Sequence, residues 1–582
     1  ASKNSQAGDV IAHKIENDFG LKGVVVKTNN TRFRSSLKKR LHNILHGFSS
    51  RSTDKKLLNI MAAEIKELNN QILKQEAAIL KRGKEEIKWG AFFQKYKTGF
   101  FQKYKKGWIK FKLSFQWQLW HQIHQYEADI KKLQKKAKLF IRKDFNYHLF
   151  STLVDHRQEI QAMLDALNSD TGNLMQAHFD KINFDVILHA LPAWITNAAD
   201  VHQALPLKKE LFDVVIIDEA TQCDIASSLP LLQRAKKVLI VGDPKQLRHI
   251  SFLSGHQQRE FAKKHKLSKI SDAKLDYRKN SLLDLVSNAI PNQNQVQLLD
   301  EHYRSMPDII DFSNQQFYNS QLKIMTATPT TLADKSVFLH LINGQRNTKG
   351  HNEEEADAIV KMIQTIIEKE SELDKNICQN IGILSPFRAQ VTYIKSKLRK
   401  VIDVKNMKRH RILVGTPHQF QGEERDIMML SFAVDKDTHP STFLYLNKPD
   451  VFNVSITRAR SLQHIFTSVD LEKLKPKYLF TQLLQQANTP VKTNKALSKY
   501  EAMDEFLEDV VSNLTRWKVD QVFKSYPIAG IDIDIVIVQR GITYCIDLVG
   551  FPGDYEAIFP LERTKMLNRM NIQTFTLPYS SW

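Results

Sequence analysis

The chain has 582 residues, of which 42% are hydrophobic, and its 84 lysines and arginines outnumber its 63 acidic residues to give a net charge of +21 at pH 7. The hydrophobic content excludes a disordered chain, the length allows about four domains, and no apolar run is long enough to cross a bilayer, so no membrane partner is expected. The basic surplus favours a polyanionic partner such as nucleic acid, and three widely separated cysteines argue against a disulfide framework or zinc site and for a cytoplasmic, intracellular protein.

Residues 51–175 are predicted to form a coiled-coil stalk. Apolar residues recur every three or four positions from Leu58 to Ile79, and again from Leu119 to Phe140. Two such stripes in succession predict two antiparallel helices that pack through their apolar faces. A hairpin that projects from a globular body also offers a surface for a protein partner.

Residues 92–99 and 100–107, between the two stripes, are near-duplicates rich in Phe, Tyr and Lys, with no acidic residue. The rings could stack on bases while the lysines follow phosphates. Alternatively, the rings pack against the stalk and the lysines line its solvated face. The pattern leaves both interpretations open.

Strand and helix patterns alternate from Phe184 to about Leu474, which predicts doubly wound α/β layers. Within this region, the β-branched run 214–217 predicts a strand buried on both faces, and it ends in Asp218 and Glu219. A second strand pattern, 238–241, runs into Gly242 and Asp243. Open α/β sheets bind ligands at the carboxyl ends of their strands, so these acidic turns suit a metal–nucleotide site. Asp218 is placed to hold Mg²⁺, and Glu219 to polarise a water molecule.

Four further segments accompany this acidic turn. They are Gly242–Leu247, Glu301–Pro307, Gln419–Asp426 and Asn453–Arg460. In order and spacing the motifs resemble those of superfamily 1 helicases, within the group related to the nonsense-mediated-decay helicase, over roughly residues 1–480. The resemblance implies two RecA-like parallel-sheet domains, the first from residues 1–50 and 176–295 and the second from 296–485, with ATP and Mg²⁺ as cofactors.

The resemblance also implies a role for each matching residue. Asp218 looks like the metal-holding residue, Glu219 the water-activating one, Gln222 and Gln246 sensors of the terminal phosphate, and Arg304 and Arg458 arginine fingers. It places Asp243, Gly422 and Glu424 at the nucleotide, and it assigns the nucleic-acid track to Ser2, Lys3, Asn4, Gln6, Trp194, Arg388 and Thr416. The implied activity is ATP-driven 5′ to 3′ movement on single-stranded DNA or RNA with little sequence preference.

The sequence contains no Gly-x-x-x-x-Gly-Lys-Ser/Thr, the phosphate-binding loop that the family carries shortly before the segment matched by Ser2–Asn4. Without the amides and lysine of that loop, we expect these residues alone to hydrolyse ATP poorly, and a chain with the loop upstream to be an ATPase. The alternative is a pseudo-helicase that binds nucleic acid or scaffolds a complex.

Residues 498–582, after a polar stretch at 485–498 that predicts a linker, form a separate α/β unit. Its expected order is a helix, a hairpin, a helix and a strand, and it resembles the restriction-endonuclease-like fold, close to the very-short-patch-repair type. Candidate metal ligands for phosphodiester cleavage are Glu505, Asp532, Asp534 and Asp547. Val549 stands where that fold has a lysine or an acid. Both a degenerate binding module and an active Mg²⁺-dependent nuclease, loaded by the motor, therefore stay open.

Overall fold

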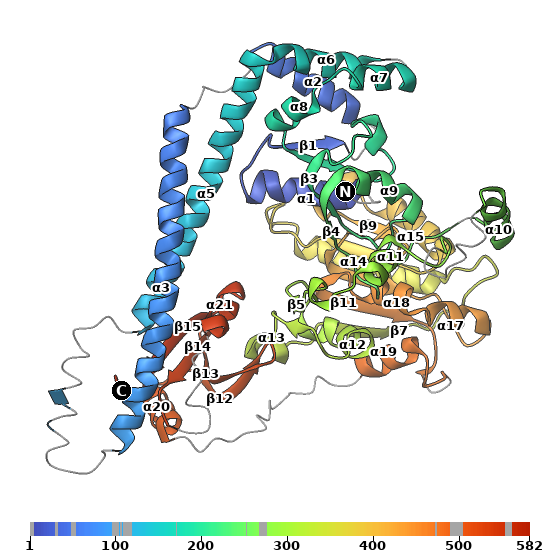
Figure 1. Cartoon of the computed structure of the whole chain (residues 1–582). Coiled ribbons are helices and arrows are strands. Elements are labelled where there is room, and N and C mark those ends of the chain that lie inside the picture. Colours follow the sequence, from blue (N-terminus) through green and yellow to red (C-terminus); the bar gives the residue numbers. More distant parts are fainter. Residues whose placement is uncertain are drawn as a thin grey trace. The chain divides into compact units, whose positions relative to one another are not determined.

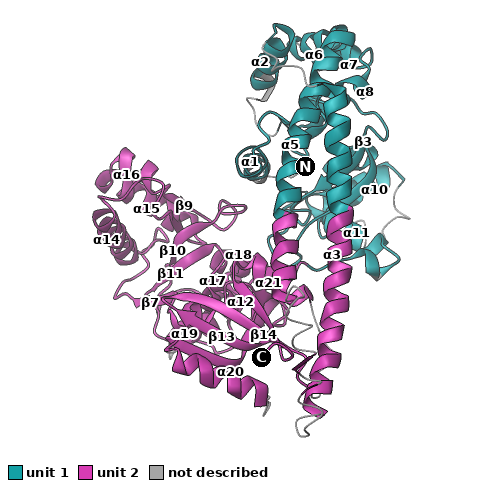
Figure 2. Ribbon diagram, turned by 90° about the vertical axis from the view of Figure 1, so that its left-hand side faces the viewer, with its two compact units in different colours: residues 1–69, 131–298 teal, residues 70–130, 299–582 magenta. Residues whose placement is uncertain are grey.

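The computed structural model describes most of the chain (Figure 1). The described residues are 5–28, 33–47, 54–95, 104, 107–108, 119–169, 171–251, 253–266, 276–471, 474–488, 505–552 and 561–582. They fall into two compact units, residues 1–69 with 131–298 and residues 70–130 with 299–582 (Figure 2). None of the described helices is long and apolar enough to span a membrane.

The first unit combines short helices with two pairs of parallel strands. Its helices are α1 (Ser5–His13), α2 (Phe33–Leu45), α6 (Arg157–Asn168), α7 (Gly172–Phe179), α8 (Phe184–Ala190), α9 (Ile225–Gln233), α10 (Gly255–Lys264) and α11 (Leu282–Ala289). Its strands are β1 (Val25–Thr28), β2 (Ala193–Thr196), β3 (Phe212–Ile217) and β4 (Ala235–Ile240). β1 pairs with β2 and β3 pairs with β4, and one hydrophobic core collects residues from both pairs and from α2, α6, α7 and α8.

The prediction that the strand at 214–217 is buried on both faces is wrong for the described structure. Ile217 is fully buried and Val215 packs against the core, but Val214 and Ile216 are 53% and 50% exposed. Side chains of a strand alternate between its two faces, and the described residues cover only one face of β3. The sequence pattern could not distinguish the covered face from the open one, because all four residues are apolar.

Two long helices, α3 (Lys55–Lys95) and α5 (Leu119–Asp155), form the predicted antiparallel pair (Figure 1). Asp54 caps α3 by accepting the Lys56 amide at 2.9 Å. Two contacts fix the register, because Lys136 Nζ lies 2.6 Å from Glu64 and Gln75 Nε2 donates to Asp129 at 2.8 Å. The stripe side chains are buried where the helices meet, including Leu68, Ile72, Ile79, Leu119 and Ile123. The pairing of two long helices is therefore confirmed, whereas most of the Phe/Tyr/Lys repeat lies outside the described residues.

The second unit contains the elements that follow residue 299. Its helices are α12 (Pro307–Phe317), α13 (Pro329–Ala333), α14 (Glu353–Lys369), α15 (Arg388–Val401), α16 (Val404–Arg409), α17 (Pro440–Leu446), α18 (Pro449–Ile456), α19 (Leu479–Asn488), α20 (Glu505–Arg516) and α21 (Leu561–Arg569). Its strands are β5 (Glu301–His302), β6 (Lys323–Ile324), β7 (Val337–Leu341), β8 (Ile381–Leu384), β9 (Leu413–Gly415), β10 (Arg425–Ser431), β11 (Ala459–Thr467), β12 (Gln521–Ile528), β13 (Ile531–Gln539), β14 (Ile542–Val549) and β15 (Gln573–Pro578).

A five-stranded parallel sheet in the order β7-β11-β10-β8-β9 forms the centre of this unit. One core joins α12, α18 and α19 to the sheet, and a second core joins α14 and α15 to it. All four residues of β8 are buried. A parallel sheet with apolar helices packed against it is the doubly wound α/β arrangement expected from the sequence.

The start of the predicted linker at 485–498 is helical instead. α19 continues to Asn488, because Leu483, Leu484 and Ala487 are buried against the core of the sheet domain. Residues 489–504 lie outside the described residues.

The C-terminal sheet has the order β12-β13-β14-β15, with three antiparallel strands and a last strand parallel to β14. β12 is an additional strand, beyond those predicted from the sequence. Lys524, Ser525 and Pro527 interrupt its apolar pattern, and an edge strand tolerates such residues because one side has no partner strand. The other expected elements, the helix from Glu505, the hairpin, α21 and the last strand, are present.

Candidate nucleotide and nucleic-acid sites

The acidic turns of the first unit lie side by side, because β3 and β4 are parallel neighbours in register. The Val241 amide donates to the Ile217 carbonyl at 2.8 Å, and the Ala220 amide donates to the Val241 carbonyl at 2.9 Å. A Cβ on Gly242 would lie 3.3 Å from the amide nitrogens of Ala220 and Thr221, so the two turns pack closely at this glycine. The structure therefore brings together the two strand ends that the sequence singled out.

Within the first turn, the backbone and side chains hold the carboxylates in place. Glu219 has a φ of +54°, a left-handed conformation that is uncommon outside glycine and often found at functional sites. Its amide donates to Asp218 Oδ1 at 2.8 Å, and Gln222 Nε2 donates to Glu219 Oε2 at 2.9 Å. In the second turn, Gln246 Nε2 donates to Asp243 Oδ2 at 2.9 Å. Each glutamine is thus oriented by the acid three residues before it.

A cavity of about 360 Å³ opens beside the first turn, within the same unit. Asp218 lines it, as do Gly8 of α1 and Thr196 of β2. Carboxylate oxygens are the ligands that Mg²⁺ prefers, and proteins commonly hold Mg²⁺ through one or two carboxylates plus phosphate oxygens and waters. Asp218 is the one carboxylate among the described residues that line this mostly apolar cavity, and its metal-holding role stays a prediction.

Arg304 belongs to the second unit, in the turn between β5 and α12. Its neighbours anchor this turn, because Ser305 Oγ donates to the Ala459 carbonyl at 2.7 Å and the Met306 amide donates to the Arg460 carbonyl at 2.8 Å. The Ser305 amide donates to His302 Nε2 at 3.0 Å, and burial, followed by the charge of Arg304, lowers the pKa of His302 to about 4. His302 is therefore a neutral acceptor at physiological pH.

Glu424 links two of the guanidinium groups in this unit. Its Oε2 lies 2.5 Å from Arg304 Nε, and its Oε1 accepts a hydrogen bond from Arg460 Nε at 3.0 Å. Arg460 also lies 3.4 Å from Asp426. The structure thus brings together Arg304 and Glu424, and it adds Arg460, which was not among the predicted site residues. Its place two residues after Arg458 in the same motif was the signal that could have identified it.

Arg458 and Gly422 are two further predicted site residues of the second unit. Arg458 is 3% exposed, and its Nε donates to the Val454 carbonyl at 3.1 Å, so the side chain lies along the end of α18. Gly422 has a φ of +76°, which a glycine adopts without strain, in the turn that leads to β10. The finger role of Arg458 stays a prediction.

Two of the predicted nucleic-acid residues lie at neighbouring strand ends of the second unit. β8 and β9 are parallel, and the Ser385 amide donates to the Gly415 carbonyl at 3.1 Å. Arg388 is exposed at the first residue of α15, and Thr416 follows β9. Exposed cations and helix N-termini at such an edge suit phosphate groups.

The other predicted track residues belong to the first unit. Trp194, in β2, is half-buried, and its indole N–H donates to the Leu191 carbonyl at 2.6 Å. Ser2, Lys3 and Asn4 lie outside the described residues, and Gln6 is placed only as part of the α1 backbone.

In the C-terminal sheet, Asp534 and Asp547 face each other across β13 and β14. Asp547 is 2% exposed and forms an ion pair with Arg563, whose Nη1 also lies 3.9 Å from Asp534. Burial and the charge of Asp547 raise the pKa of Asp534. Asp532 and Glu505 are exposed. The guanidinium of Arg563 supplies the positive charge that a metal ion would supply, so the acids fit an internal ion pair better than a metal site.

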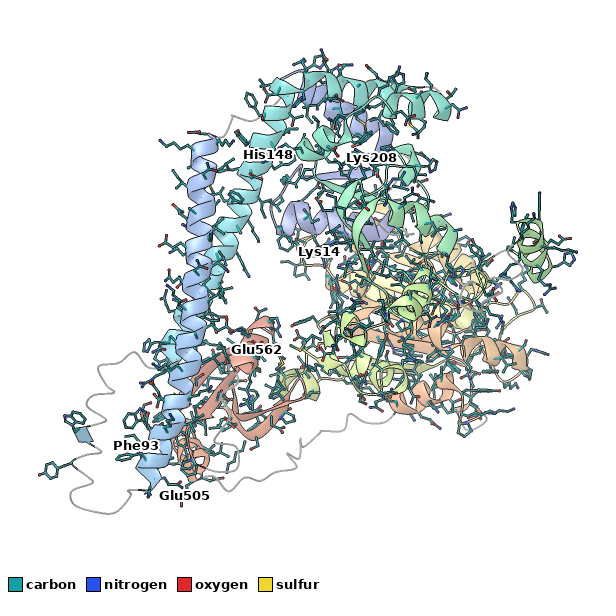
Figure 3. All side chains as sticks on the ribbon, in the orientation of Figure 1. Lys14, Phe93, His148, Lys208, Glu505 and Glu562 are labelled. Carbon is teal, nitrogen blue, oxygen red and sulfur yellow. The ribbon has the colours of Figure 1, made fainter. Side chains whose placement is uncertain are left out.

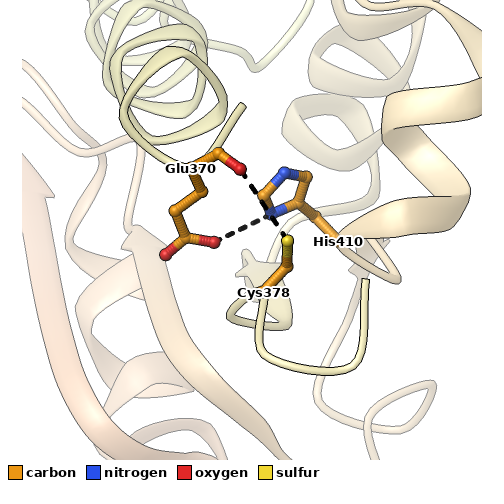
Figure 4. Close-up of side chains that lie close together, drawn as sticks. All are labelled: Glu370, Cys378 and His410. Atoms are coloured by element: carbon orange, nitrogen blue, oxygen red, sulfur yellow. Dashed lines mark hydrogen bonds and ion pairs between the residues drawn. The ribbon is translucent and has the colours of Figure 1, made fainter. Parts of the chain in front are cut away.

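Among the described residues, one group combines three different potential metal ligands, Glu370, Cys378 and His410 (Figure 4). Arg409 lies against the same group, because its Nε donates to Cys378 Sγ at 3.1 Å and its Nη2 to the Glu370 carbonyl at 2.7 Å. His410 Nδ1 lies 3.1 Å from the Gln379 carbonyl. These contacts tie the loop after α14 to α16, and we assign the group a structural role.

The chain is similar to two AAA domain models and to proteins named as helicases. Residues 5–252 match the model of an AAA domain, and residues 278–470 match that of a second AAA domain. Helicase sen1 of Schizosaccharomyces pombe is 30% identical over 295 residues, which cover 47% of this chain and 16% of that protein. The uncharacterized ATP-dependent helicase MG140 of Mycoplasma genitalium is 26% identical over 362 residues, which cover 59% of this chain and 30% of that protein.

A solved structure, that of the PRRSV helicase, superposes with a TM-score of 0.25 and 15% identity over 51% of this chain and 46% of that chain. A superposition at that level adds no argument on the fold. The chain spans less than a third of the length of the two curated relatives named above. Neither AAA match extends beyond residue 470, so the restriction-endonuclease-like fold of the C-terminal unit stays a prediction.

Proposed function

We propose that this chain, which carries two AAA domains related to those of superfamily 1 helicases, is the motor part of an ATP-dependent helicase that acts on nucleic acid. The observation that carries the proposal is the match of two consecutive AAA domains, at residues 5–252 and 278–470. The two acidic strand ends of the first domain and the arginine-bearing turns of the second are among the groups that nucleotide hydrolysis needs.

Magnesium-bound ATP would supply the phosphoryl group and the ion that neutralises its charge. On the protein side, Asp218 would hold the metal, and Glu219 would accept a proton from the attacking water. The hydrogen bond from Gln222 Nε2 to Glu219 Oε2, at 2.9 Å, supports this role because it fixes the direction of the carboxylate. Gln222 and Gln246 would also contact the terminal phosphate, with Asp243 orienting Gln246.

From the second domain, Arg304 and Arg458 would neutralise the charge that develops on the transferred phosphoryl group, and Gly422 and Glu424 would lie at the ribose. A planar guanidinium binds two phosphate oxygens at once, which suits an arginine finger. The contact between Arg304 and Glu424 supports a shared site, since one nucleotide could reach both.

The nucleic-acid track is proposed to be a single strand, followed in the 5′ to 3′ direction. The net charge of +21 supports a polyanionic partner, and the exposed Arg388, with Thr416 after the neighbouring strand, supports contacts to phosphates rather than to base edges. Such contacts carry no sequence information, so little sequence preference is expected.

ATP hydrolysis by the full-length protein, with and without single-stranded DNA or RNA, tests this proposal, and the Glu219→Gln variant tests the mechanism. Glu219→Gln should lower the rate of hydrolysis at least about 100-fold, because the amide cannot accept a proton, while ATP binding is kept. Glu210→Gln, an exposed residue at the start of the same strand region, is the matched control. Because the 582 residues contain no Gly-x-x-x-x-Gly-Lys-Ser/Thr, the same residues alone should hydrolyse ATP poorly.

Three outcomes distinguish the alternatives. Hydrolysis that nucleic acid stimulates and Glu219→Gln abolishes supports the motor. Binding of nucleic acid by the full-length protein with no hydrolysis would instead indicate a scaffold of the pseudo-helicase kind. Full turnover by Glu219→Gln would refute the assignment of the acidic turn.

A further inference from the structure

The C-terminal helix α21 makes contacts in three directions within the second unit. Arg563 forms an ion pair with the buried Asp547 of its own sheet. Lys565 and Asn568 contact the two stalk helices, and Arg569 contacts β5. Helix α21 therefore packs on its own sheet and also contacts the stalk helices and β5, which are far from it in the sequence.

The contact with β5 is a two-point ion pair. Arg569 Nη2 donates to Glu301 Oε1 at 2.5 Å, and Arg569 Nε donates to Glu301 Oε2 at 3.1 Å. The Tyr303 hydroxyl donates to the same carboxylate, and it accepts a hydrogen bond from Arg569 Nε at 3.3 Å. The hydrogen bonds from Arg569 and Tyr303 lower the pKa of Glu301. Paired hydrogen bonds between planar groups fix orientation as well as distance.

Apolar packing by a residue after β6 is a second contact between β5 with β6 and the C-terminal sheet. β6 pairs with β5, and Met325, which follows β6, donates its amide to the His302 carbonyl at 2.9 Å. Its side chain is 3% exposed, and it belongs to the core of the C-terminal sheet with Tyr526, Ile528 and Ile533. The C-terminal domain, which comprises the described residues 505–552 and 561–582, therefore supports β5 through the buried Met325 side chain and through the two hydrogen bonds from Arg569 to Glu301.

The other end of α21 is attached to the stalk. Lys565 Nζ lies 2.8 Å from Glu76 of α3 and 2.9 Å from Glu562, which Figure 3 labels, and Asn568 contacts Glu127 of α5. The domain also meets α3 backbone to backbone, because a Cβ on Gly90 would fall 1.4 Å from the Gly550 carbonyl oxygen. The domain that holds β5 is thus itself fixed against this half of the stalk.

We propose that Arg569 is a positioning residue for Arg304, and that the C-terminal domain acts through it on nucleotide hydrolysis. Glu301 and Tyr303, which Arg569 grips, lie three residues and one residue before Arg304. Fixing them limits the orientations open to the turn that carries the guanidinium. The proposal rests on the proposed function, since it requires Arg304 to act on ATP.

The test measures nucleic-acid-stimulated ATP hydrolysis by the full-length protein. Arg569→Ala and Glu301→Gln should each lower kcat about tenfold, because a small misplacement of a catalytic group is costly. The KM for ATP should change by less than about twofold, since the lost interaction acts on the transition state. The reversed pair, Arg569→Glu with Glu301→Arg, should recover most of the lost kcat. A general loss of stability would not be rescued in this way.

Arg516→Ala is the matched control, because Arg516 is exposed on α20 of the same domain, and its kcat should equal that of the wild type. Unchanged kcat in both Arg569→Ala and Glu301→Gln, or a reversed pair no better than the single variants, would overturn the proposal. Arg304→Ala distinguishes failure of the finger role of Arg304 from failure of the positioning role of Arg569. If it leaves hydrolysis intact, the finger role and this inference both fail, and if it abolishes hydrolysis while Arg569→Ala is normal, this inference alone fails.

Discussion

Arg304 and Glu424 form an ion pair, with Arg304 Nε 2.5 Å from Glu424 Oε2, although 120 residues separate them in the sequence. The same carboxylate holds Arg460. The side chains of Arg304 and Glu424 are 38% and 32% exposed, and ion pairs in such positions contribute only about 0–1 kcal/mol. Replacing Glu424 by a phosphate oxygen as the partner of Arg304 therefore costs little free energy. Glu424 can orient the Arg304 guanidinium without competing strongly with a nucleotide.

Loss of the Arg304 guanidinium should slow ATP hydrolysis far more than it weakens ATP binding. Arg304→Ala is expected to lower kcat by about 10³-fold, the size of an arginine-finger effect, with a small change in the KM for ATP. Arg304→Lys should restore little, because an ammonium group cannot bind two oxygens as a planar fork does. Steady-state hydrolysis by the full-length protein measures both. Arg399→Ala, at an exposed position of α15, serves as the control, and equal kcat in Arg304→Ala and this control would rule out the finger role.

Arg388 should contribute to nucleic-acid affinity without contributing to sequence preference. Arg388→Ala is expected to weaken binding of all single strands alike, and to reduce the slope of log affinity against log salt concentration by about one unit. Burial, and to a smaller extent the charge of Arg388, lowers the pKa of His418. Fluorescence anisotropy at several salt concentrations measures the slope. A change that depends on base composition would contradict a phosphate contact.

Asp534 and Asp547 of the C-terminal sheet should not cleave nucleic acid. Arg563 already pairs with Asp547 and lies 3.9 Å from Asp534, so a metal ion would have to displace a guanidinium. We expect the full-length protein to produce no nicks in plasmid DNA with Mg²⁺ or Mn²⁺, and Asp547→Asn to behave in the same way. Metal-dependent nicking that Asp547→Asn abolishes would restore the nuclease interpretation.

Glu355, at the start of α14, should make the stability of the second AAA domain depend on pH. Its side chain is fully buried, and burial raises its pKa to about 7 despite hydrogen bonds from Ser431 Oγ at 2.7 Å and the Ala433 amide at 3.0 Å. The folded state therefore binds a proton that the unfolded state has lost between about pH 4.5 and 7. Binding of this proton stabilises the folded state by about 3 kcal/mol at low pH, and this contribution to the free energy of unfolding is lost as the pH rises through 7.

Glu355→Gln should flatten this pH dependence and raise the melting temperature at pH 8 relative to the wild type. The Gln side-chain oxygen can still accept the Ser431 and Ala433 hydrogen bonds. Glu354→Gln, at the neighbouring exposed position, should leave the pH profile unchanged. Thermal unfolding between pH 5 and 8 measures the three profiles, and parallel curves for Glu355→Gln and the wild type would contradict the expectation.

Gly90→Ala should destabilise the contact between the stalk and the C-terminal domain. In most helices this substitution stabilises by up to about 1 kcal/mol, but here the added methyl group meets the Gly550 carbonyl oxygen. Overpacking of this kind costs about 1–3 kcal/mol. Gly172→Ala is the control, because a Cβ there has nothing within 4 Å. Thermal unfolding, with limited proteolysis of the C-terminal domain, compares the variants, and a more stable Gly90→Ala protein would be inconsistent with this contact.

Chain order and local spacing alone were enough to predict the α/β class, the pair of long helices and the acidic turns. These features depend on neighbours within a few residues, such as the apolar stripe from Leu58 to Ile79 or the strand that precedes Asp218. The open face of β3 and the helical residues 485–488 were mispredicted, because burial depends on which elements pack nearby and not on the hydrophobicity of the segment itself.

Only the tertiary structure decided which charged groups meet. Glu424 lies between Arg304 and Arg460, Arg563 pairs with Asp547, and Arg569 reaches Glu301 across 268 positions of sequence. Each of these pairings is set by how strands and helices pack, and side chains that far apart in the sequence carry no local signal of their contact. The motifs identify the chemistry, and the packing of the domains selects the partners that hold each group in position.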